Sequence, residues 1–107
     1  MSGRLPTHLE VAGWRRAVEA AGGFTTVLQR GEADAGSALL LTIERGENPT
    51  IWERMPQLDG SRAFTRVAIQ DVDFAEYLER RKRQDRDLWI VELDIANPER
   101  FVDLRPG

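Results

Sequence analysis

The sequence predicts an α+β domain in which a mostly antiparallel sheet of about five strands carries helices on one face, in the order α-β-β-β-β-α-β-α. Near the N-terminus and again after residue 73, apolar residues recur every three to four positions, which is the period of a helix. Elsewhere the period falls to two, and Gly, Pro and Asp-Gly turns separate the short runs, which is typical of strands. Helices packed on a sheet bury both kinds of apolar surface in the simplest way.

The first helix is predicted from about residue 8 to residue 21. Thr7 and Glu10 have the spacing of a capping box, and an apolar stripe follows at helical steps. Gly22 and Gly23 then supply a left-handed stop.

Four strands are expected next, at residues 24–30, 38–45, 50–55 and 62–69. Asp59-Gly60 is a strong hairpin dipeptide, and Pro56 places the end of the third strand, or a sheet edge, nearby. No connection between these four strands is long enough for a crossover, so we expect an antiparallel meander.

A second helix is predicted to begin at Asp71 or Asp73, either of which can cap it. A fifth strand at 88–95 has apolar residues on both faces of its first half, which indicates a central position. Its neighbours in the sheet cannot be decided from periodicity. Asn97-Pro98 then opens a short terminal helix that extends through Leu104.

The length and composition of the chain exclude several classes of functional site. The chain has 107 residues, which fits a single domain over 1–107 with tails at 1–4 and 105–107 that we expect to fray. Without Cys and with one His, the chain lacks thiolate metal sites, Cys nucleophiles and His-rich sites. A net charge of −3 argues against a globally basic nucleic-acid binder. We find neither a membrane span nor a signal peptide, and we expect a cytoplasmic protein.

Catalytic and metal motifs are weak. Three acidic pairs have ligand-like spacing but lack a third ligand: Asp71/Asp73, Asp85/Asp87 and Glu92/Asp94. No serine lies in a nucleophile elbow, and His8 reads as a surface residue near a helix start. We therefore predict no catalytic residue, no cofactor and no metal, although an enzyme of an undetected type stays a third alternative.

One charged cluster is a candidate site for an anion or a nucleic acid. It consists of the basic residues at the end of the second helix: Arg80, Arg81, Lys82, Arg83 and Arg86. Arg15, Arg16 and Arg66 would extend it if the fold brought them near. Acidic neighbours interleave with the cluster, however, and the C-terminal end of any helix favours cations. An ordinary solvated helix end is therefore the competing interpretation.

A protein interface is the other candidate. If Ile51 and Met55 point inwards, Trp52 and Arg54 point outwards together, and Trp beside Arg is a common composition of interface hot spots. Burial of Trp52 within its own chain is the alternative. Our leading hypothesis is a small binding domain whose partner is a protein, including a second copy of the chain. Nucleic-acid binding comes second, and no membrane partner is expected.

Several strings make the chain similar to a known family. They are RLPTHLEV at 4–11, ADAGSALL at 33–40, ERMPQLDG at 53–60 and the segment at 77–94. The chain resembles an uncharacterised family of short alphaproteobacterial proteins, the domain of unknown function DUF1491. The resemblance covers nearly the whole chain and implies a bacterial, cytosolic, single-domain protein. It implies no activity, so no functional residue is carried over. The resemblance also implies a high-GC genome, which would explain the preference for Arg over Lys; Lys82 is the single lysine.

Overall fold

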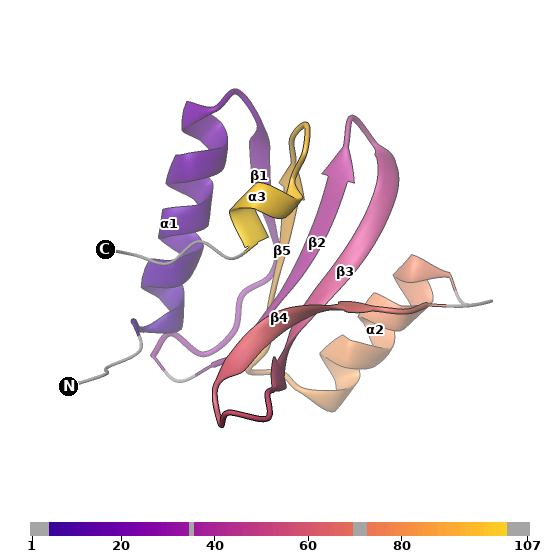
Figure 1. Cartoon of the computed structure of the whole chain (residues 1–107). Coiled ribbons are helices and arrows are strands. Elements are labelled where there is room, and N and C mark those ends of the chain that lie inside the picture. The colour runs from indigo at the N-terminus through magenta and orange to yellow at the C-terminus, as the bar shows by residue number, and fades with distance from the viewer. Residues whose placement is uncertain (1–4, 35, 70–72, 103–107) are drawn as a thin grey trace.

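A computed structural model of the chain describes residues 5–34, 36–69 and 73–102. Its helices and strands follow the predicted order (Figure 1): α1 (Thr7–Ala20), β1 (Phe24–Gln29), β2 (Ala38–Glu44), β3 (Glu47–Pro56), β4 (Arg62–Val67), α2 (Phe74–Gln84), β5 (Trp89–Asp94) and α3 (Glu99–Val102). The α+β class and the element order are therefore confirmed. The alternative cap Asp71, the helix end at Leu104 and the tails 1–4 and 105–107 lie outside the described residues.

The sheet is mixed but mostly antiparallel, with the strand order β1-β5-β2-β3-β4. β5 lies between β1 and β2, antiparallel to β1 and parallel to β2. The predicted meander is thus correct for β2, β3 and β4 and wrong for β1, which does not pair with β2. β5 takes the inner place because its side chains are buried on both faces, with Ile90 and Val91 both 0% exposed.

Two glycines allow the insertion of β5. The loop from β1 to β2 has to cross the start of β5, and a Cβ on Gly31 would lie 2.2 Å from the carbonyl oxygen of Asp87. A Cβ on Gly36 would lie 2.6 Å from the same oxygen. The Glu32 N–H donates a hydrogen bond to this oxygen at 3.0 Å. Only residues without a side chain permit such a close approach of two backbones.

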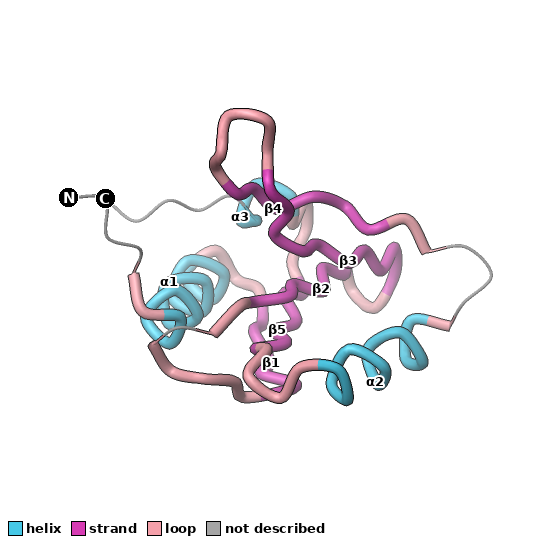
Figure 2. The backbone as a smooth tube through the Cα atoms, turned by 90° about the horizontal axis from the view of Figure 1, so that it is seen from below, coloured by secondary structure: helices cyan, strands magenta, loops and turns pink. Residues whose placement is uncertain are grey.

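Both faces of the sheet carry helices, so the expectation of helices on one face is wrong. α1 and α3 cover one face, where Leu40, Val91 and Leu93 are buried. α2 covers part of the other face, over Leu39 and Ile51. Figure 2 shows α1 and α2 on opposite sides of the strands. The physical reason is that β2 and β5 are apolar on both faces, and one layer of helices can bury only one of them.

The start of α1 also differs from its prediction. Pro6 is the N-cap residue, and its side chain has no group that can accept a hydrogen bond. Thr7 lies inside the helix, and its buried hydroxyl donates to the Gly36 carbonyl, 29 positions along the chain. The capping box was therefore wrong, whereas the Asp73 cap of α2 is confirmed by its bond to the Ala75 N–H at 3.0 Å.

Candidate functional site

The basic end of α2 is divided between the sheet and the solvent. Arg81 points to β3 and donates to Glu53 from Nε and Nη2, at 3.2 and 2.8 Å. Lys82 pairs with Glu79 at 2.8 Å on the helix surface. Two of the five predicted cations are therefore neutralised within the chain.

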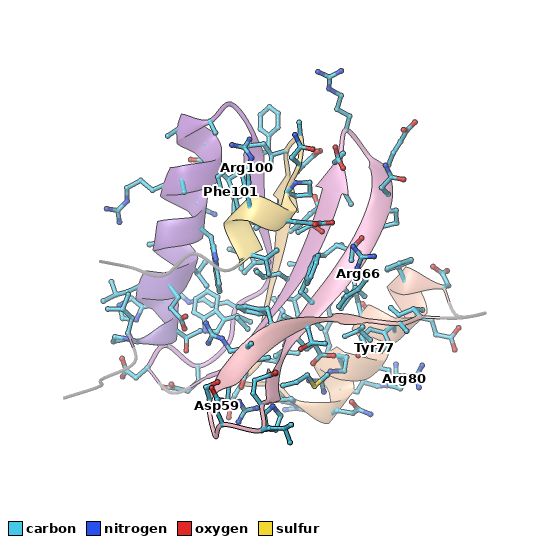
Figure 3. All side chains as sticks on the ribbon, viewed as in Figure 1. Asp59, Arg66, Tyr77, Arg80, Arg100 and Phe101 are labelled. Carbon is cyan, nitrogen blue, oxygen red and sulfur yellow. The ribbon has the colours of Figure 1, made fainter. Side chains whose placement is uncertain are left out.

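The other three, Arg80, Arg83 and Arg86, are exposed. The Arg80 guanidinium lies 5.9 Å from the centre of the Tyr77 ring, and both residues project from α2 in Figure 3. Arg15, Arg16 and Arg66 do not extend this group. Arg66 pairs with Glu99 of α3, and Arg15 and Arg16 belong to α1, on the opposite face of the sheet. Within the cluster predicted at the end of α2, Arg80, Arg83 and Arg86 are therefore the cations that make no ion pair with a described residue.

Tyr77 connects α2 to the same glutamate, because its hydroxyl donates to Glu53. Burial, and then this hydrogen bond, raise the pKa of Tyr77 to about 12. The pKa is raised above the ordinary value of 10.0, so the neutral phenol stabilises the folded state below pH 10.0, and this contribution is lost as the pH rises towards 12.

We therefore expect Tyr77→Phe to lower the free energy of unfolding by about 1 kcal/mol at pH 7, since one hydrogen bond is lost. The variant should also lose less stability than the parent between pH 10 and 12. Tyr77 is the sole tyrosine, so ultraviolet absorbance of tyrosinate measures its pKa directly. An absorbance midpoint at the ordinary value would contradict the contact with Glu53.

The predicted interface residues Trp52 and Arg54 lie on β3 and take part in contacts within the domain. Trp52 is half-buried against the core beneath α1 and α3, and its Nε1 donates to Thr42 Oγ1 at 2.9 Å. Arg54 forms a two-pronged ion pair with Glu10 of α1, and its side chain is 16% exposed. These contacts leave little of either side chain for a partner.

A cleft of about 670 Å³ lies between α1 and β1. Val11, Val27 and Trp89 supply apolar surface, and Trp89 is 4% exposed. Six further side chains line the cleft, of which four are charged and all but Ala12 are exposed: His8, Ala12, Arg15, Arg16, Glu19 and Arg30. The cleft therefore joins an apolar floor to a rim that is basic at three arginines and acidic at one glutamate.

Hydrogen bonds hold this floor and one end of the cleft in place. The Trp89 indole N–H donates to the Glu32 carbonyl at 2.7 Å, and the Arg30 guanidinium lies 5.6 Å from the centre of the Trp89 ring. At the start of α1, the His8 N–H donates to the Ala33 carbonyl at 2.9 Å. The loop after β1 thus closes this end of the cleft.

The three rim arginines are exposed. Arg15, Arg16 and Arg30 form no ion pair with any residue that the structure describes. Guanidinium groups donate in pairs to carboxylates and phosphates, and they stay charged at all physiological pH values. The sequence indicates a role for Arg15 and Arg16 only as an extension of the basic cluster in the second helix. No local pattern connects them with Arg30, which follows β1, or with Trp89 of β5.

Among the described residues, no three His, Cys, Asp or Glu side chains are grouped so as to hold a metal ion. Within the same residues, no helix has the length and apolar character needed to cross a membrane.

Comparison with known proteins identifies the family. A model of a protein family of unknown function, DUF1491, matches residues 5–103. The chain belongs to this family. A crystal structure of a DUF1491 family protein from Caulobacter crescentus is 30% identical, with 94% of this chain and 96% of that chain covered and a TM-score of 0.83. The NMR structure of a DUF1491 family protein from the same organism has 28% identity, the same coverage and a TM-score of 0.79.

The solution structure of protein Atu0922 from A. tumefaciens is also similar to this DUF1491 chain. It is 27% identical, with 98% of this chain and 99% of that chain covered and a TM-score of 0.76. No curated protein matches the chain. The resemblance seen in the sequence is confirmed, and the family assigns no function to any residue.

Proposed function

We propose that this protein is a bacterial cytosolic binding domain that holds an anionic ligand in the cleft between α1 and β1. The observation that carries the proposal is the convergence of Arg15, Arg16 and Arg30 over a floor containing Trp89. The bacterial family members and the absence of Cys support the setting.

The chemistry of the cleft suits the binding of an anion. Its rim holds three guanidinium groups beside His8 and Glu19, and guanidinium groups donate paired hydrogen bonds to carboxylates and phosphates. The floor is apolar, so a ligand held by the rim can also contact apolar surface at Val11, Val27 and Trp89. These properties suit a ligand that combines negative charge with some apolar or planar surface.

Titration with sodium tripolyphosphate at low ionic strength tests the proposal. Amide signals of residues around the cleft should shift in two-dimensional NMR spectra, and added salt should weaken the binding because the contacts are electrostatic. The double substitution Arg15→Gln/Arg16→Gln should weaken binding about tenfold, since charge-assisted hydrogen bonds are lost.

The matched control is Arg80→Gln/Arg83→Gln, which removes the same charge from α2.

The second candidate function, anion or nucleic-acid binding at the end of α2, is favoured by the exposure of Arg80, Arg83 and Arg86. If the α2 variant loses binding and the α1 variant retains it, that second candidate replaces the cleft. If neither the parent nor the variants bind tripolyphosphate, the proposed function is wrong.

A further inference from the structure

β1 forms an open edge of the sheet. It pairs with β5 on one side, and in the part of the chain that the structure describes no other backbone hydrogen bond joins β1 to another segment. Its sequence, FTTVLQ, contains no charged residue and no proline. Natural edge strands usually carry such residues, because free N–H and C=O groups otherwise pair with other chains.

The opposite edge is protected in the usual manner. β4 carries Arg62 and Arg66, and both are exposed. The difference between the two edges is therefore one of sequence as well as position. β1 is the edge that is suited to receive another strand, and the register irregularity between Val27 and Gln29 limits the receptive part to its first half.

The two faces beside β1 differ in charge. On the face covered by α1, the arginine rim of the cleft lies next to Val27. On the other face, Thr26 pairs with Glu92, and Phe24 pairs with Asp94 and is 72% exposed. A strand added at this edge would place alternate side chains on these two faces. Its acidic side chains fit the α1 face, and its apolar side chains fit the face of Phe24.

We propose that an extended acidic segment of a partner protein adds to β1 as a further strand of the sheet, with alternate acidic side chains in the cleft. This inference rests on the proposed function, because the arginine rim that holds an anion is the feature that selects the acidic strand. Backbone hydrogen bonds to β1 supply the affinity, and the alternation of acidic and apolar side chains supplies the specificity.

Repulsion between arginines argues against a second copy of the chain as the partner at β1. If two β1 strands paired antiparallel about a two-fold axis, the two α1 helices would flank that axis on the same face of the joined sheet. Arg15 and Arg16 of one copy would then approach the same residues of the other, which repel each other. An acidic strand meets the opposite charge in the same place.

The test uses a blocked heptapeptide of alternating Val and Glu, with Val at both ends, and the complete protein. We expect saturable binding, shifted signals for the β1 amides and slower hydrogen exchange of those β1 amides that face outwards. A peptide with Lys in place of Glu should not bind. Arg15→Gln/Arg16→Gln should weaken binding of the acidic peptide about tenfold.

Methylation of peptide nitrogens separates strand addition from simple charge attraction. In an extended strand, alternate N–H groups point to opposite edges, so one peptide methylated on its Glu nitrogens and another methylated on its Val nitrogens should behave differently. One of the two should bind at least about tenfold more weakly, and the other should bind like the parent peptide. Equal binding of both methylated peptides and the parent would overturn the inference.

Substitutions on β1 provide a second measurement. Thr26 is exposed on the first half of β1, and Thr26→Asp adds a negative charge at the edge, which should weaken peptide binding at least about fivefold. Thr65→Asp is the matched control, since Thr65 is exposed on β4 at the opposite edge of the sheet. Equal binding by the two variants would contradict docking at β1.

The outcomes also separate the two proposals. If tripolyphosphate binds in the cleft but the peptide does not, the proposed function stands and strand addition is wrong. If neither ligand binds, both proposals fail. If the protein alone forms dimers with protected β1 amides, a second copy is the occupant and the acidic strand is wrong.

Discussion

Gly31→Ala is expected to lower the free energy of unfolding by about 3 kcal/mol, because the new methyl group overlaps backbone that cannot rotate away. The added Cβ would lie 2.2 Å from the Asp87 carbonyl oxygen and 2.7 Å from the Leu88 carbonyl carbon. Relief requires the β1–β2 loop to move off the start of β5. For a domain of this size the melting temperature should fall by about 12–24 °C, as measured by circular dichroism.

Gly13→Ala is the control for this prediction. Gly13 lies inside α1, and a Cβ there would meet nothing within 4 Å. Alanine is favoured over glycine in a helix, so this substitution should stabilise the protein by about 0.5–1 kcal/mol. A Gly31→Ala variant that melts with the parent protein would show that the two backbones do not approach closely in solution.

The Gly31→Ala substitution should also affect ligand binding in the cleft. Gly31 directly follows Arg30, and the loop that begins there holds both Trp89, through Glu32, and His8, through Ala33. A displaced loop would move Arg30 away from Trp89. We therefore expect Gly31→Ala to weaken tripolyphosphate binding even at temperatures where the variant is folded.

Arg54→Met is expected to cost about 2–3 kcal/mol. The substitution retains an unbranched side chain over Phe64, whose ring centre lies 4.7 Å from the guanidinium, but leaves the Glu10 carboxylate without its cation. Breaking a fully buried pair costs roughly 3–5 kcal/mol. We expect less here because the two side chains retain 16% and 13% exposure. Urea denaturation measures this change in the free energy of unfolding. The comparison is valid if both variants show the same dependence of that free energy on urea concentration.

Two further variants test whether the loss in Arg54→Met comes from the broken ion pair with Glu10. Glu10→Gln in the Arg54→Met background should recover part of the loss, since an uncharged amide is cheaper to leave without a cation. Arg66→Met should change stability by less than about 0.5 kcal/mol, because its pair with Glu99 is 60% and 67% exposed. If Arg54→Met proved equally neutral and instead reduced self-association, Arg54 would be an interface residue and not a link between α1 and β3.

Local patterns were sufficient to predict most elements of this fold. The helical stripe of α1, the Asp73 cap of α2 and the Asp59-Gly60 turn each depend on residues within a few positions of one another. The start of α1 shows where this reasoning ends. Thr7 has the spacing of a cap, but its hydroxyl bonds to Gly36, a partner that only the folded chain brings near.

The candidate sites depend even more on contacts between segments that are distant in the sequence. A run of basic residues at the end of α2 was visible in the sequence, yet Arg81 is bound by Glu53 of β3 and Lys82 by Glu79. The cleft, by contrast, combines Arg15 and Arg16 with Arg30 and Trp89. These residues come from α1, the position after β1, and β5, so no motif or spacing could have indicated the site.

The sequence alone determined the class, the kind and order of elements, and the central character of β5, because periodicity and turn chemistry act over short distances. Tertiary structure decided the place of β5 between β1 and β2, the position of α2 on the second face and the union of the arginines with Trp89. Those features depend on pairing between distant segments. The burial of two apolar faces and the close approach that Gly31 and Gly36 permit determine that pairing. The apolar faces of β5 are visible in its sequence, but the strands that flank it and the backbone that approaches Gly31 and Gly36 have no local signature.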